Sequence, residues 1–202
     1  GERVAPLSVV GLLVGFGGAA SFDPRARKVA AAPAQLLKKA GVNFAVLGKE
    51  ETCTGDPARR IGDEFLFQER AQANVETLGR RKVKKIVTPC PHCHNTLKNE
   101  YPQFGGQYEV QHHSALLAEL IEAGRLTNAA DGSKDPITLH DPCHLAPVNC
   151  EVAATRAVGG AAPHGPFRET ARRGTQTVLC AAARDPERVA QPPAARGPLS
   201  RP

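Results

Sequence analysis

The feature that most constrains the fold of this chain is a cysteine placed directly after a short apolar segment, as in KKIVTPC. Four apolar runs are followed within a few residues by a cysteine: Cys53, Cys90, Cys143 and Cys180. Short apolar runs bounded by turn residues are typical of strands buried in a sheet. The sequence predicts strands over residues 7–17, 42–48, 84–89, 107–113, 135–143 and 175–180. We therefore expect a sheet whose strands deliver cysteines at their ends.

Helical patterns lie between these strands, over residues 23–41, 63–80, 94–101 and 114–124. Asp23 is the expected N-cap of the first helix and Gly41 its end. Pro33 lies inside this helix, where a proline is expected to kink or break it at a cost of about 3 kcal/mol. The last helix is expected to begin at Ser114 as the cap and to end at Gly124.

The alternation of strands and helices predicts an α/β fold, a parallel sheet with helices on both faces. Ligands of such sheets collect at the carboxyl ends of the strands. Cys53 and Cys90 have 36 residues between them, and so do Cys143 and Cys180. We infer two cysteine-rich halves, a first half over residues 1–127 and a partial second half over 128–182. Residues 183–202, rich in Pro and Arg, are expected to be a disordered tail.

Composition excludes several functional classes. The net charge is +6, but the basic residues are spread along the chain without interleaved aromatic residues, so we expect no nucleic-acid partner. No segment approaches the ~20 apolar residues of a membrane span, and no segment has the pattern of a secretory signal. We therefore expect a cytoplasmic protein. In that setting the six cysteines indicate metal binding or redox chemistry rather than a disulfide framework.

Three segments closely resemble the cysteine-rich (CCG) domain proteins: ETCTGDPARRIGDEFLFQ, VKKIVTPCPHCHNTLKNEYPQFGGQYEVQHHSALLAELIEAGRL and ITLHDPCHL. This family includes the cysteine-rich subunit of heterodisulfide reductase and the iron–sulfur subunits of glycolate, glycerol-3-phosphate and lactate oxidation systems. The resemblance covers roughly residues 10–150. It implies an iron–sulfur electron-transfer subunit rather than a complete enzyme. It also implies a flavoprotein or other redox subunit as partner, and association with the inner face of the membrane through such partners.

The family pattern in each half is a lone cysteine, then Cys-Cys-Gly or Cys-Thr-Gly, then CxxC. In the first half, Gly18 or a neighbour stands where the lone cysteine is expected. Cys53 matches the second element, and Cys90 with Cys93 matches the third. In the second half, Cys143 matches the lone cysteine. Cys180 matches the start of Cys-Cys-Gly, but alanines follow it and no further CxxC occurs.

The resemblance implies a [4Fe–4S] cluster, which usually takes four thiolates, or a [3Fe–4S] cluster where one ligand is missing. Cys53, Cys90 and Cys93 are the expected ligands, and Cys143 is the next. Cys180 is a further cofactor-binding candidate. His92 and His94 are weaker candidates for the remaining position. Cys150 is expected to be structural, since isolated cysteines often act as small buried hydrophobic residues.

Three alternatives remain open. The CPHC motif is similar to the active site of oxidising thioredoxin-fold enzymes, which would make the chain a thiol–disulfide oxidoreductase. Cys53, Cys90 and Cys93 with a histidine or Cys143 would also suit a structural zinc module. The incomplete second half is consistent with a truncated or decayed family member without turnover of its own.

Other polar residues near these motifs have simpler roles. The His112-His113 pair and His140 are expected to cap helices or to form hydrogen bonds at the end of the sheet. Asp56, Arg59 and Arg60 are expected to form a helix N-terminus and its charge network, with no catalytic role.

Overall fold

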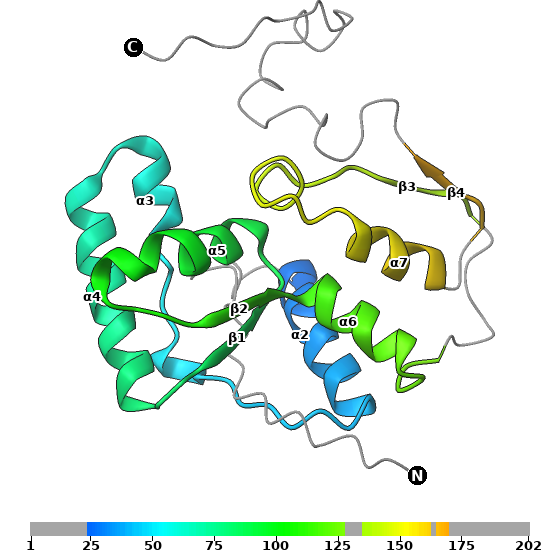
Figure 1. Cartoon of the computed structure of the whole chain (residues 1–202), viewed down its shortest axis with the longest axis horizontal. Coiled ribbons are helices and arrows are strands. Elements are labelled where there is room, and N and C mark those ends of the chain that lie inside the picture. Colours follow the sequence, from blue (N-terminus) through cyan, green and yellow to red (C-terminus); the bar gives the residue numbers. More distant parts are fainter. Residues whose placement is uncertain (1–23, 128–134, 163–164, 170–202) are drawn as a thin grey trace, which may run out of the picture.

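The computed structural model describes residues 24–127, 135–162 and 165–169 (Figure 1). The α-helices are α2 (Pro24–Lys39), α3 (Asp56–Ile61), α4 (Glu64–Arg80), α5 (Pro91–Asn95), α6 (His113–Glu122) and α7 (Ala153–Ala161). The shorter helical turns are η1 (Gly48–Glu50), η2 (Thr96–Glu100) and η3 (Tyr101–Phe104). The strands are β1 (Lys85–Thr88), β2 (Glu109–His112), β3 (Ile137–Leu139) and β4 (Phe167–Glu169).

The centre of the first region is the parallel pair β1–β2, in which Ile86 faces Val110 across the ladder. Successive side chains of a strand point to opposite faces. Ile86 therefore packs into one core and Val87 into another, and both are almost completely buried. Burial of such a side chain contributes roughly 1.5–3 kcal/mol, so both faces of this short sheet need a covering layer.

Helices supply that cover on both faces (Figure 1). On one face α4 contributes Phe67, Ala71 and Leu78, which pack with Ile86 and with Tyr101 of η3. The core of the other face is built by α2 and α6 around Val87, with the buried side chains Leu37, Ala40, Val42, Leu116 and Leu120. The two cores together fix the position of β1, and hence of the cysteine motif that follows it.

The second region is the parallel pair β3–β4, with α7 as the connection. Helix α7 packs beside α6, which joins the second region to the first (Figure 1). Arg156 of α7 pairs with the buried carboxylate of Asp141 (2.7 Å) and with Glu169 of β4 (2.7 Å). These ion pairs hold the segment after β3, which carries Cys143, in place.

The predicted α/β class, with parallel strands and helices on both faces, is confirmed. Helix α4, with Asp63 as its N-cap, agrees with the predicted helix over 63–80. Strands β1, β2 and β3 fall within the predicted segments 84–89, 107–113 and 135–143.

Three local predictions were wrong. Residues 42–48 form a single bridge at Asn43 rather than a strand, because Val46 lies exposed and Gly48 turns the chain with φ +61°. Pro33 does not break α2, which runs on to Lys39 with Pro33 and Leu37 buried. The N-cap of α6 is His112, not Ser114, since the His112 side chain accepts from the backbone N–H of Ser114.

Several predictions lie outside the described residues. These are the strands over 7–17 and 175–180, the Asp23 cap, the loop at Gly18, Cys180 and the tail over 183–202. The division into halves at residues 127 and 182 also stays a prediction.

Candidate functional site

The CPHC motif forms the turn between β1 and α5. Cys90 has an extended backbone (φ −98°, ψ 118°) and is the N-cap of α5, with Pro91 in the first turn. Proline is favoured there because its missing N–H would have no helical partner. The backbone N–H of Cys93 donates to the Cys90 sulfur at 3.5 Å. The turn therefore places both sulfur atoms on one side, Cys90 half-buried and Cys93 buried.

Two neighbours fix the loop that leads into this turn. The Thr88 hydroxyl accepts from the Cys90 N–H at 3.2 Å. The buried His112, at the end of β2, uses Nε2 to donate to the carbonyl of Pro89 at 3.2 Å, while Nδ1 faces the Ser114 hydroxyl at 2.8 Å. Burial lowers the pKa of His112 to about 3, so this imidazole is neutral. The expected capping role of the histidine pair is thus confirmed for His112.

Cys53 approaches from a second loop, between η1 and α3, rather than from the end of a described strand. The Gly55 N–H donates to the Cys53 sulfur at 3.5 Å. Within the same loop, the buried Thr54 hydroxyl donates to the Cys93 sulfur at 3.5 Å. This contact joins the Cys-Thr-Gly loop to the CPHC turn at the sulfur atom.

Two polar side chains hold the Cys-Thr-Gly loop in place. The Tyr101 hydroxyl donates to the Thr54 carbonyl at 3.1 Å, and Asn74 of α4 donates to the Cys53 carbonyl at 2.9 Å. Asn74 also donates to the Tyr101 hydroxyl at 3.0 Å. Burial raises the pKa of Tyr101, so its hydroxyl stays protonated and able to donate. The loop is therefore positioned by α4 and η3 together.

Replacing Gly55 with Ala is expected to lower the free energy of unfolding by about 2 kcal/mol. Gly55 has φ +84°, and a Cβ there would lie 3.0 Å from Phe67 Cδ2 and 3.3 Å from Arg70 Cβ. Gly62→Ala is the matched control, because Gly62 has φ +90° with no atom within 4 Å of the added Cβ. Both variants carry backbone strain, but only Gly55→Ala adds the steric clash. We therefore expect urea unfolding to show a larger loss of stability for Gly55→Ala than for Gly62→Ala. Equal losses would show that close packing at Gly55 is unimportant.

The two thiols of the CPHC turn differ in acidity. The hydrogen bond with Cys93 lowers the pKa of Cys90 to about 6, aided by the N–H groups of Cys93 and His92 and opposed by burial. The same hydrogen bond, together with burial, raises the pKa of Cys93. One proton shared by the pair is therefore held mainly at Cys93. A negative charge on Cys53 raises the pKa of Cys93 further, because two thiolates near each other repel.

Asp56 links α3 to α5 beneath the motif. Its carboxylate accepts from Arg60 (2.9 Å), from Nδ1 of His92 (2.9 Å) and from the Thr96 hydroxyl (3.1 Å). Burial raises its pKa, but the hydrogen bonds from His92 and Arg60 outweigh this and lower the pKa of Asp56 to about 2. The hydrogen bond to Asp56 in turn raises the pKa of His92. The expected charge network around Asp56 and the arginines is confirmed, and it includes a histidine of the CPHC motif.

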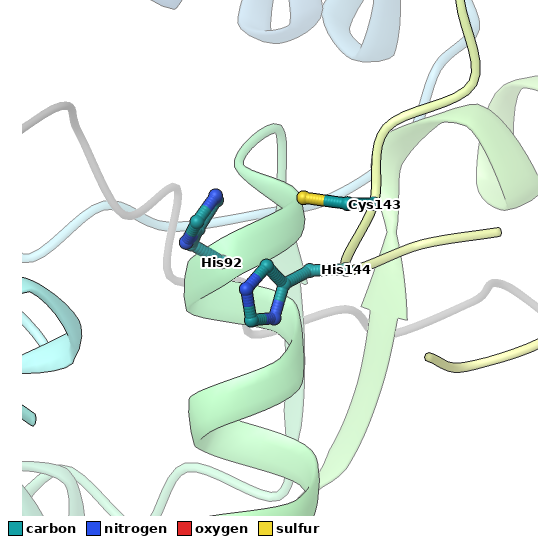
Figure 2. Close-up of side chains that lie close together, drawn as sticks. All are labelled: His92, Cys143 and His144. Carbon is teal, nitrogen blue, oxygen red and sulfur yellow. The ribbon is translucent and has the colours of Figure 1, made fainter. Parts of the chain in front are cut away.

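Cys143 lies in the segment after β3, as predicted, and is buried. Its sulfur is near His92 and His144 rather than alone: one ligand atom from each residue lies within 4.8 Å of the other two (Figure 2). His144 was not predicted from the sequence, although its position directly after Cys143 in HDPCHL was an available signal. The pairing of His92 with Asp56 was not predicted either.

The remaining predicted residues are separate from these groups. His94 is fully buried, with Nε2 3.4 Å from the Glu151 carboxylate. Cys150 is exposed and has φ +58°, so the prediction of a buried, structural cysteine was wrong for this position. It follows directly on the turn over 143–149 and has a left-handed backbone. None of the five described cysteines takes part in a disulfide.

The chemistry of this donor set fits an iron–sulfur cluster. Cluster irons are held by cysteine thiolates, and hydrogen bonds to the sulfur atoms tune them. The three thiols lie on two loops joined by the contact between Thr54 and the Cys93 sulfur, and an N–H or O–H donor is directed at each sulfur. The thiolates are spread over separate irons in such a cluster, so they need not converge on one point.

Comparison with known proteins gives the class of the first region. Residues 16–98 match the family model described as the cysteine-rich domain, CCG. Residues 16–98 are therefore similar to a CCG cysteine-rich domain, and the resemblance stated from the motifs is confirmed. No solved structure matches the chain.

Particular relatives have names from redox biology. The chain is 42% identical over 167 residues to the "Probable iron-sulfur-binding oxidoreductase FadF" of Bacillus subtilis, covering 83% of this chain and 23% of that protein. It is 48% identical over 130 residues to the "EtfAB:quinone oxidoreductase" of Syntrophomonas wolfei, covering 64% and 18%. It is 37% identical over 123 residues to one subunit of the dihydromethanophenazine:CoB--CoM heterodisulfide reductase of Methanosarcina barkeri, covering 58% and 30%. The chain thus spans less than a third of the length of these relatives.

Within the described residues, no helix has both the length and the apolar character needed to cross a membrane.

Proposed function

We propose that this chain is the cluster-binding part of an iron–sulfur electron-transfer subunit in a multi-subunit oxidoreductase. Cys53, Cys90 and Cys93 are its cluster ligands in this proposal. The observation that carries it is the hydrogen bond from Thr54 to the Cys93 sulfur, which ties the Cys-Thr-Gly loop to the CPHC turn. The names of the relatives, an iron–sulfur-binding oxidoreductase and a heterodisulfide reductase subunit among them, support it.

Three thiolates suit a [3Fe–4S] cluster or a [4Fe–4S] cluster with one iron that takes another ligand. Cys143 and Cys180 are the remaining thiols that the predicted ligand set offers. The low pKa of Cys90 favours the thiolate that iron requires, because a metal ligand must be deprotonated. The bound cluster would supply one-electron transfer, and the protein would supply the thiolates and the N–H and O–H groups that stabilise their charge.

The partner in this proposal is a flavoprotein or another redox subunit. One relative is named as a subunit of a larger reductase and another is named as a quinone oxidoreductase, which supports an assembly of this kind. A third relative is named "Probable membrane-anchored ferredoxin". In this proposal the chain lies in the cytoplasm, at the inner face of the membrane through its partners.

The test is reversible reduction of the anaerobically reconstituted protein. Dithionite is expected to bleach the brown absorption of the cluster, and a mild one-electron oxidant is expected to restore it over repeated cycles. A protein that stays brown but cannot be reduced would contradict electron transfer. A colourless protein would contradict the cluster itself.

The second candidate is a thiol–disulfide oxidoreductase, which the acidity of Cys90 beside a buried Cys93 favours. In this case the Cys90 thiolate would attack a substrate disulfide, forming a mixed disulfide and releasing one substrate thiol. Cys93 would then attack the Cys90 sulfur, which releases the second substrate thiol as the Cys90–Cys93 disulfide forms. The discriminating observation is the effect of Cys53→Ser on iron binding and on disulfide reduction. Loss of Cys53 leaves a dithiol intact but removes a cluster ligand.

A further inference from the structure

A second group of metal-binding side chains lies beside the CPHC turn. His92 comes from α5, whereas Cys143 and His144 come from the segment after β3. Figure 2 shows the Cys143 sulfur and the His144 ring facing the helix that carries His92. One ligand atom of each lies within 4.8 Å of the other two. Zinc, with bonds of about 2.0–2.1 Å to nitrogen and ~2.3 Å to sulfur, spans such a group after small side-chain rotations.

His92 is already oriented as a metal-binding histidine would be. Its Nδ1 donates to the buried Asp56 carboxylate at 2.9 Å, which leaves Nε2 as the nitrogen with a lone pair. Histidines that bind metals usually give their other N–H to a carboxylate in this way, which fixes the tautomer and raises ligand basicity. Arg60 and Thr96 hold the carboxylate from the other side.

His144 provides an independent indication of a missing ligand. Its Nδ1 is buried and has no hydrogen-bond partner within the described part of the chain. A buried polar atom without a partner costs about 1–3 kcal/mol, so such atoms call for an explanation. The rings of His92 and His144 lie 4.0 Å apart between centroids, so the two imidazoles are direct neighbours.

The geometry points to a mononuclear zinc site formed by His92, Cys143 and His144, separate from the proposed cluster. Two imidazoles and one thiolate are ligands that Zn²⁺ prefers, and three protein ligands leave a fourth position open. Cys143 is only 6% exposed, whereas the His92 side chain is 42% exposed, so solvent reaches the site from the His92 side. Cys143 then serves zinc rather than a corner of the cluster. The site does not depend on the cluster being present.

The test separates zinc from iron by removing the cluster ligands first. The variant carrying Cys53→Ser, Cys90→Ser and Cys93→Ser is purified without metal and titrated with Co²⁺ alone, then with Zn²⁺. We expect one Co²⁺ per chain, with the visible bands of a tetrahedral thiolate-bound ion, displaced by Zn²⁺. A fourth substitution in this variant, His144→Ala, His92→Ala or Cys143→Ser, is expected to weaken Co²⁺ binding. Loss of a partner that only supports a ligand weakens metal binding roughly 10–100-fold, and we expect a larger effect here because a ligand itself is lost.

Matched controls come from the same part of the chain. His140→Ala and Cys150→Ser alter an exposed histidine and an exposed cysteine outside the group, and we expect both to leave Co²⁺ affinity unchanged. In the otherwise unaltered protein, His144→Ala is expected to remove zinc and to leave reconstituted iron in place. Loss of iron in that variant would show that His144 and Cys143 complete the cluster. Failure of the triple variant to bind Co²⁺ would overturn the site, whatever the iron content of the parent chain.

Discussion

Replacing Cys93 with Ser is expected to abolish cluster incorporation. Cys93 is the central thiol of the candidate site, because it shares a hydrogen bond with Cys90 and accepts another from Thr54. Iron–sulfur clusters bind through thiolates, and a serine oxygen at this buried position provides no equivalent ligand. We expect iron retained after anaerobic reconstitution and desalting to fall to background. Cys90→Ser is expected to give the same result.

Cys150→Ser is the control for these variants. Cys150 lies outside any disulfide, as the candidate ligands do, but it is exposed and takes no part in the sulfur contacts described. We expect this variant to retain iron at the level of the unaltered chain. If Cys93→Ser and Cys150→Ser retained equal amounts of iron, the ligand assignment would be wrong.

Asp56→Ala is expected to lower the free energy of unfolding at neutral pH by about 2–3 kcal/mol. The Asp56 side chain is 5% exposed and accepts three hydrogen bonds, of which the one from His92 ties α3 to α5 and the one from Thr96 ties α3 to η2. Its pKa falls from 3.8 to about 2 in the folded chain, which is the source of that magnitude. Urea unfolding of the two proteins at a series of pH values measures the difference.

The sign of the pH dependence follows from that shift. A folded-state pKa below the unfolded value stabilises the protein fully above about pH 4, and this contribution is lost as pH falls through about 2. The stability difference between the unaltered chain and Asp56→Ala should therefore shrink from pH 4 to pH 2. Glu76→Gln, at an exposed position of α4, serves as the control. A difference that stays constant over this range would contradict an ionised, hydrogen-bonded Asp56.

The helices and strands that were predicted correctly are those whose sequence signals lie within the element itself or directly beside it. Asp63 before α4 is a helix cap three residues ahead of the N–H that it binds, and β1 carries the adjacent apolar residues Ile86 and Val87 shortly before a proline. The strand predicted over residues 42–48 was wrong because the apolar residues of this segment suit a strand and an exposed extended loop equally. Only tertiary packing distinguishes the two. The cap of α6 was misplaced because His112 performs a role that serine more often has.

The candidate site was predicted only in its sequence-local parts. The CPHC turn and the Cys-Thr-Gly loop were visible as motifs, but their junction depends on the contact between Thr54 and Cys93. The pairing of His92 with Asp56, and of His92 with His144, joins segments far apart in the chain. Such contacts follow from how α3, α5 and the segment after β3 pack, which no local pattern reports.

Iron and acid-labile sulfide per chain, measured after anaerobic reconstitution, test the cluster most directly. Ligation by Cys53, Cys90 and Cys93 predicts about three or four iron atoms with about four sulfides per chain, and a triple serine variant without either. A chain that took up no sulfide, or whose iron content was the same with and without these three thiols, would contradict an iron–sulfur centre at this site.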